Sequence, residues 1–152
     1  MPPGYQVSYT STQIILSQTQ GYASWAAAKG LNGSPGRENG YTADPDHDGI
    51  PNIIEFVLDG NPLAGSHAND PTVTLASHHV SFSFRRRDDS SYLNPVVEFA
   101  TSLGGPWSTV TDGLNGSITV QDNGTAPDTV TVTIPRDSIP RMFLRLKVTV
   151  PN

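Results

Sequence analysis

Apolar side chains recur at every second position through most of the chain beyond residue 70, and this pattern restricts the fold more than any other feature of the sequence. Alternate residues of a β-strand face the same side, so a stretch of this kind predicts a strand with one buried face. The repeats fall at Val73/Leu75, Val80/Phe82/Phe84, Leu93/Val97/Phe99, Ile118/Val120, Val130/Val132/Ile134 and Leu144/Leu146/Val148/Val150. Pairs such as Asn-Gly and Asp-Gly separate them, as is usual for turns between short strands. We therefore expect residues 66–152 to form an antiparallel β-sandwich or an open barrel, and we favour the sandwich.

The preceding part of the chain lacks this regularity and divides into two segments. Residues 1–20 contain two short alternating stretches, 5–10 and 13–17, which predict a β-hairpin and suggest the tail of an upstream module. Residues 21–65 begin with an alanine-rich stretch that ends at Gly30 and predicts a helix. A second short helix is expected over residues 52–58, where Asp59-Gly60-Asn61-Pro62 stops it. The chain is thus predicted to be mainly β, with a short helical segment before the sandwich.

The loop between the two expected helices carries an acidic motif with regular spacing. Residues 44–55 place oxygen-bearing side chains at positions 1, 3, 5, 9 and 12 of a twelve-residue loop, with Gly49 at position 6. The side chains belong to Asp44, Asp46, Asp48, Asn52 and Glu55, and the backbone carbonyl of Ile50 falls at position 7. Calcium takes six to eight oxygen ligands at about 2.3 to 2.6 Å, and a chain coiling round one ion presents alternate residues to it. This is the spacing of an EF-hand loop, so we predict that these residues bind one calcium ion.

The charge around the motif also favours a cation. Seven of the fourteen carboxylates lie between Glu38 and Asp70, where the chain has no lysine or arginine. Paired EF-hand loops exchange backbone hydrogen bonds at position 8, but here that residue is Pro51, which has no N–H to donate. One unpaired loop predicts a structural site and not a sensor. We expect such a loop to bind calcium weakly, with a dissociation constant of about 10⁻⁴ to 10⁻³ M, the range typical of extracellular modules. A site this weak fills only at the calcium concentration outside a cell, so we expect a secreted or cell-surface protein.

Several phrases along the chain accompany this loop. They are Tyr22-Ala-Ser-Trp25-Ala-Ala-Ala-Lys-Gly30-Leu31, residues 44–55 followed by Phe56, Asn61-Pro62, Phe82-Ser-Phe-Arg85-Arg86, Val97-Glu98-Phe99-Ala-Thr-Ser102, Pro106-Trp107 and Phe143-Leu-Arg145-Leu-Lys-Val148. Together they resemble the C-terminal accessory module of large secreted bacterial proteins, which combines a helical segment, one dockerin-like or thrombospondin type 3-like calcium loop and a β-sandwich. The resemblance implies a non-catalytic domain that is covalently part of a secreted enzyme or adhesin. A dockerin has two calcium repeats and this chain has one, so the resemblance does not extend to cohesin binding.

Charge and motif content argue against other classes of protein. A net charge of −5 gives the chain no electrostatic attraction to nucleic acid. No apolar run reaches the roughly 18 to 20 residues that span a membrane, and the Met-Pro-Pro-Gly start lacks signal-peptide character, so we expect a fragment of a longer protein. The sequence has no cysteine and no assembled Ser/His/Asp, phosphate-binding or paired-carboxylate arrangement. We therefore expect no enzymatic activity.

Two alternative functions stay open. A carbohydrate-binding module would stack sugar rings on Trp107 and Tyr92 and use Arg85 and Arg87 to contact a polysaccharide. The same residues also suit structural roles, because aromatic side chains pack in cores and charges at a strand end protect an edge from aggregation. The second alternative is a C-terminal sorting or anchoring domain for the cell surface.

Overall fold

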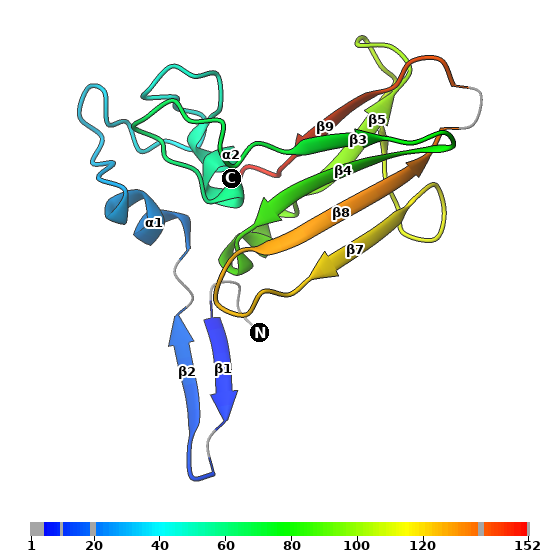
Figure 1. Cartoon of the computed structure of the whole chain (residues 1–152). Helices are drawn as coiled ribbons and strands as arrows, with labels where there is room; N and C mark the ends of the chain where they lie inside the picture. Colours follow the sequence, from blue (N-terminus) through cyan, green and yellow to red (C-terminus); the bar gives the residue numbers. More distant parts are fainter. Residues whose placement is uncertain (1–4, 10, 19–20, 137–138, 152) are drawn as a thin grey trace.

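The computed structural model describes residues 5–9, 11–18, 21–136 and 139–151, and the chain is mainly β (Figure 1). The elements are β1 (Tyr5–Tyr9), β2 (Ile14–Gln18), α1 (Tyr22–Ala28), α2 (Asn52–Leu58), β3 (Thr72–Leu75), β4 (His79–Arg86), the 3-10 helix η1 (Asp88–Leu93), β5 (Val96–Ala100), β6 (Ser108–Thr109), β7 (Ser117–Gln121), β8 (Asp128–Pro135) and β9 (Phe143–Lys147). The strands β1 and β2 pair in a hairpin, as predicted. Two larger antiparallel sheets have the orders β3-β4-β8-β7 and β6-β5-β9. The predicted fold class is confirmed.

The centre of the four-stranded sheet is the pair β4 and β8, in which the predicted alternation is complete. The buried residues are Val80, Phe82 and Phe84 of β4 and Val130, Val132 and Ile134 of β8. The residues between them face outward and carry hydroxyl groups that pair across the two strands. Ser81 bonds Thr133 at 3.2 Å, and Ser83 bonds Thr131 at 3.0 Å. Each of these strands therefore has one apolar and one polar face, which fixes its register because a shift by one residue would expose the apolar face.

The three-stranded sheet contributes to the same hydrophobic core. Val97 of β5 is buried in it, and Phe99, Leu144 and Leu146 pack against it from the same face. In the part of the chain that the structure describes, neither edge of this sheet pairs with the four-stranded sheet. The two layers are thus separate sheets over one core, as in a sandwich, and do not close into a barrel.

The edge strands of the four-stranded sheet are less covered than the sequence predicts. Val73 and Leu75 of β3 pair with core-facing residues of β4, yet their exposed fractions are 58% and 65%. Ile118 and Val120 of β7 occupy the equivalent place beside β8 and are 38% and 44% exposed. A sheet of three strands, one of them only two residues long, is too narrow to cover both edges of a sheet of four.

The two short helices pack beside the sandwich, and both predicted helices are present. The helix α1 ends before Gly30, and α2 ends at Asp59, which adopts the left-handed conformation with φ 60°. Seven residues make about two turns, too few for a helix to be stable without packing. Tyr22 and Trp25 of α1 place their rings 5.6 and 5.5 Å from Phe56 of α2, which is fully buried. These rings join the same core cluster as the strands.

Two local predictions were wrong. The pattern grouped Leu93 with the strand residues Val97 and Phe99, but Leu93 ends η1, because Asn94 adopts a left-handed conformation and Pro95 follows it. The apolar alternation predicted that the last strand extends to Val150, whereas β9 covers Phe143–Lys147.

Among the described residues, neither α1 nor any other helix has the length and apolar character needed to cross a membrane.

Candidate metal centre

The loop of residues 44–55 leads directly into α2, and hydrogen bonds hold its two ends together. The amide of Asn52 donates to the carbonyl of Ala43 at 2.8 Å, and the amide of Ile53 donates to the carbonyl of Tyr41 at 2.9 Å. The first turn of α2 is thereby fixed beside the segment that enters the loop. The sharp turns between are made at His47 and Gly49, both with positive φ, of 62° and 90°.

The three aspartates of the loop converge on one point. One carboxylate oxygen from each of Asp44, Asp46 and Asp48 lies within 4.8 Å of the others, so this cluster could hold a metal ion. The remaining oxygens accept backbone N–H groups of the loop itself. Asp44 Oδ2 accepts from Gly49 at 3.0 Å, Asp46 Oδ1 accepts from Asp48 at 3.3 Å, and Asp48 Oδ1 accepts from Ile50 at 2.8 Å. Each aspartate therefore shapes the loop with one oxygen and leaves the other available.

The available oxygens are buried. Within the described residues, Asp44 Oδ1, Asp46 Oδ2 and Asp48 Oδ2 are shielded from solvent and have no hydrogen-bond partner. A buried acceptor without a partner costs free energy, about 1 to 3 kcal/mol or more when it is charged. Three such acceptors side by side are a site that a cation would stabilise.

Asn52 contributes a fourth oxygen with a fixed orientation. Its side chain is fully buried, and its amide nitrogen donates to the carbonyls of Glu38 at 2.8 Å and Gly40 at 3.0 Å. These two bonds decide which end of the amide is nitrogen. The oxygen Oδ1 is left buried with no partner in the described chain.

Glu55 supplies the last of these oxygens, from the middle of α2. It is 4% exposed, and Oε2 has no partner among the described residues. Burial first, and then the charges of Asp46, Asp48 and Asp44, together raise the pKa of this carboxyl to about 8, against a smaller opposing effect of Lys29. Gly60 lies against the glutamate, where a Cβ would approach Glu55 Cβ to 3.0 Å. The site thus holds a carboxyl group that keeps its proton at neutral pH unless positive charge is added.

Three side chains of the predicted ligand set, those of Asp44, Asp46 and Asp48, converge on one point, while Asn52 and Glu55 each keep one buried oxygen without a partner in the described chain. The amide of Ile50 is held by Asp48, while coordination by its carbonyl stays a prediction. Oxygen donors without nitrogen or sulfur suit hard cations. His47, the histidine of the loop, is exposed and its Nδ1 lies 3.0 Å from the carbonyl of Pro45.

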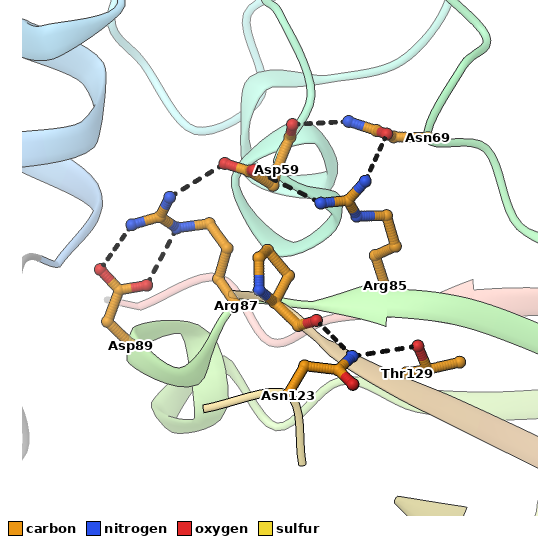
Figure 2. A network of polar contacts seen from close by, with 8 residues as sticks. Asp59, Asn69, Arg85, Arg87, Asp89, Asn123 and Thr129 are labelled. Atoms are coloured by element: carbon orange, nitrogen blue, oxygen red, sulfur yellow. Dashed lines mark hydrogen bonds and ion pairs between the residues drawn. The ribbon is translucent and has the colours of Figure 1, made fainter. Parts of the chain in front are cut away.

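The residues proposed for sugar binding make contacts within the chain. Arg87 binds Asp59 and Asp89, and Arg85 binds Asn69 and lies 3.8 Å from Asp59 (Figure 2). The two arginines thus meet at one acid, at the end of α2.

The two aromatic candidates also have neighbours. The hydroxyl of Tyr92 accepts the amide of Tyr22 at 3.4 Å, and its ring lies 6.5 Å from that of Phe56. Trp107 is covered on one side by the guanidinium of Arg145, 4.1 Å from the ring centroid.

Some functional contacts have no signal in the sequence. The backbone carbonyls of Glu38 and Gly40 orient Asn52, and any residue type could supply a carbonyl. The hydroxyl of Tyr22 shares the Gly40 carbonyl at 3.0 Å, which ties the aromatic cluster to the loop. A long-range pairing of this kind appears only in the folded chain.

Comparison of the chain with models of known protein families found no match, and comparison with curated protein sequences found none either.

Proposed function

We propose that this protein is a non-catalytic, extracellular accessory module, part of a larger secreted enzyme or adhesin, and that one calcium ion stabilises it. One observation carries the proposal. Five buried side-chain oxygens without partners in the described chain come from loop positions 1, 3, 5, 9 and 12, which are the ligand positions of an EF-hand loop. Water or a protein donor would otherwise be needed at each of them.

The number and type of donors favour calcium over other metals. One oxygen from each of Asp44, Asp46, Asp48 and Asn52, the Ile50 carbonyl and both oxygens of Glu55 would give seven ligands, within the range that calcium takes. Magnesium requires a near-ideal octahedron and usually keeps several waters, so it suits this set less well. Zinc prefers nitrogen and sulfur donors, and the chain has no cysteine.

The role of the ion would be to hold the loop and α2 in place. A ligand that binds only the folded state stabilises it by RT ln(1 + [Ca]/Kd), which is about 0.4 to 1.4 kcal/mol in 1 mM calcium for dissociation constants of about 10⁻³ to 10⁻⁴ M. Calcium at that concentration is found outside cells, which supports an extracellular location. The resemblance to accessory modules of secreted proteins supports the same location.

Calorimetric titration of chelator-stripped protein with calcium tests the proposal. We expect one ion to bind with a dissociation constant of about 10⁻⁴ to 10⁻³ M. Asp46→Ala should abolish binding because it removes one of the converging carboxylates. Asp70→Asn is the matched control, because Asp70 lies in the same acidic stretch but pairs with the exposed His67. Absence of binding by the unsubstituted protein would refute the proposed function.

A further inference from the structure

The C-terminal end of α2 is held by an arginine from the sandwich. Arg87 follows β4, and its Nη1 donates to Asp59 Oδ1 at 2.9 Å (Figure 2). The same guanidinium donates from Nε and Nη2 to the two oxygens of Asp89, both at 3.0 Å. A guanidinium bound in this two-pronged way has little freedom to rotate. Arg87 is therefore a rigid bridge between η1 and Asp59, the C-terminal cap residue of α2.

The backbone and the guanidinium of Arg87 make further contacts with the same helix. Its amide donates to the carbonyl of Val57 at 3.0 Å, and the guanidinium carbon lies 5.4 Å from the centre of the Phe56 ring. Arg87 thus touches α2 at Phe56, Val57 and the cap residue Asp59.

Arg85 reaches the same acid with a weaker hold. Its Nη2 is 3.8 Å from Asp59 Oδ2, and its Nη1 donates to Asn69 Oδ1 at 3.2 Å. The Arg85 side chain is 47% exposed, whereas that of Arg87 is 22% exposed. Arg85 and Arg87 therefore contact the same acid, Asp59, and the contact of Arg85 is the longer and more exposed one.

The helix that Arg87 holds also carries Glu55, one turn before Asp59. The amide of Gly60 donates to the carbonyl of Glu55 at 2.7 Å, and Gly60 packs against the Glu55 side chain. The helix is too short to keep its position without external contacts. Its first turn is held by Ala43 and Tyr41, and its C-terminal cap residue is held by Arg87.

We infer that Arg87 is a positioning residue for the metal centre: it fixes the end of α2 against the sandwich and so sets the place at which Glu55 meets the ion. The inference rests on the proposed calcium site and extends it beyond the loop. Coupling between two sites is reciprocal, so an ion that fixes Glu55 also stabilises the contacts of Arg87 with Val57 and Asp59.

The test compares calcium affinity in Arg87→Ala and Arg85→Ala by calorimetry, at a temperature where circular dichroism shows both variants folded. Arg87→Ala should raise the dissociation constant about 5- to 50-fold, within the usual range of coupling between sites. Arg85→Ala should change it less than about 2-fold, because its bond to Asp59 is longer and more exposed to solvent. Arg87→Lys should recover part of the loss, since one ammonium can still pair with Asp59 but cannot bridge both acids.

A second measurement separates positioning from a loss of stability. Calcium should slow hydrogen exchange of the Arg87 amide, which donates to Val57, in the unsubstituted protein, and this slowing should shrink in Asp89→Asn, which keeps the arginine but loosens it. This variant also serves if Arg87→Ala does not fold. Calcium affinity unchanged in both Arg87→Ala and Asp89→Asn would overturn the inference while leaving the calcium site intact. No binding by the unsubstituted protein would overturn both.

Discussion

Two buried glutamates, one in the helical segment and one in the sandwich, have opposite surroundings. Glu55 and Glu98 are each 4% exposed. Glu98, on the outer face of β5, accepts Arg145 Nε and Nη2 at 2.8 and 2.6 Å and Lys147 Nζ at 2.9 Å. These cations lower its pKa. Glu55 has three aspartates as charged neighbours, against a smaller opposing effect of Lys29, and its pKa is raised to about 8 with burial as the first cause.

The two regions differ in whether the chain itself supplies counterions for the buried glutamate. Glu98 has its counterions within the chain, because Arg145 and Lys147 of β9 neutralise its charge on β5. Around Glu55 the acids outnumber the nearby cations, and one oxygen from each of Asp44, Asp46 and Asp48 lies within 4.8 Å of the others. This cluster could hold a metal ion, which would add the positive charge that the neighbouring side chains do not supply.

The largest effect is expected where the two regions share a core. Phe56 of α2 is fully buried and belongs to the same cluster as Phe82 of β4, so Phe56→Ala should destabilise the whole chain by about 3 to 5 kcal/mol. Urea unfolding would be followed by far-ultraviolet circular dichroism for the strands. In a Trp107→Phe background, the fluorescence of Trp25 reports on the helical segment, because the chain has two tryptophans.

Both probes should give the same transition before and after the substitution. If Trp25 reported a transition at lower urea concentration than the strands, the helical segment would unfold as an independent unit, and the shared core would contribute little to its stability. Val120→Ala is the control, because Val120 is 44% exposed and should cost less than about 1 kcal/mol.

Calcium removal should have a smaller effect that is concentrated in one region. We expect the chelated protein to melt about 1 to 6 °C lower than the protein in 1 mM calcium, which corresponds to about 0.4 to 1.4 kcal/mol. In hydrogen exchange, calcium should protect the amides of Asn52 and Ile53, which tie α2 to the loop, more than those of β8. Equal protection of β8 would contradict the view that the ion orders mainly the helical segment.

The two glutamates should also give the regions opposite responses to pH. The pKa of Glu55 is raised from 4.5 to about 8 on folding, so the calcium-free protein should lose stability as the pH rises from about 4.5 to 8. The pKa of Glu98 is lowered from 4.5, so its contribution is present above that value and is lost on acidification. Urea midpoints measured from pH 3 to pH 9 should separate the two slopes.

Calcium and one substitution serve as controls for this pH dependence. Saturating calcium should remove the slope above pH 4.5, since the ion requires an ionised Glu55, and Glu55→Gln should remove it in the calcium-free protein. Calcium binding at pH 7 should also release protons, which calorimetry in buffers of different ionisation heat detects. A calcium-free protein whose stability rises steadily from pH 5 to pH 8 would show that Glu55 is not shielded as the structure places it.

The sequence predicted the two regions by different signals, and each signal failed at a definite point. Period-two alternation found the strands β4 and β8 but not β6, because two residues are too few to show a period. The ligand spacing predicted the converging aspartates, because a coiled loop needs alternate residues. Neither signal could predict the partners of the three consecutive arginines 85–87. Arg86 binds Asp128 and Arg87 binds Asp59 and Asp89, and such choices depend on packing of distant segments.

The smallest effect is expected at the uncovered edge of the sandwich. Leu75 lies on the inner side of β3 beside Val80, but it is 65% exposed. Leu75→Lys should therefore change the free energy of unfolding by less than about 0.5 kcal/mol, because the ammonium stays in water and little apolar surface is lost from the core. Val80→Lys is the matched substitution across the strand pair, and it should be severely destabilising because Val80 is 4% exposed. Both are measured by urea unfolding in calcium. A large loss of stability for Leu75→Lys would mean that another segment covers β3 in solution, and the sandwich would then be as closed at this edge as it is at its centre.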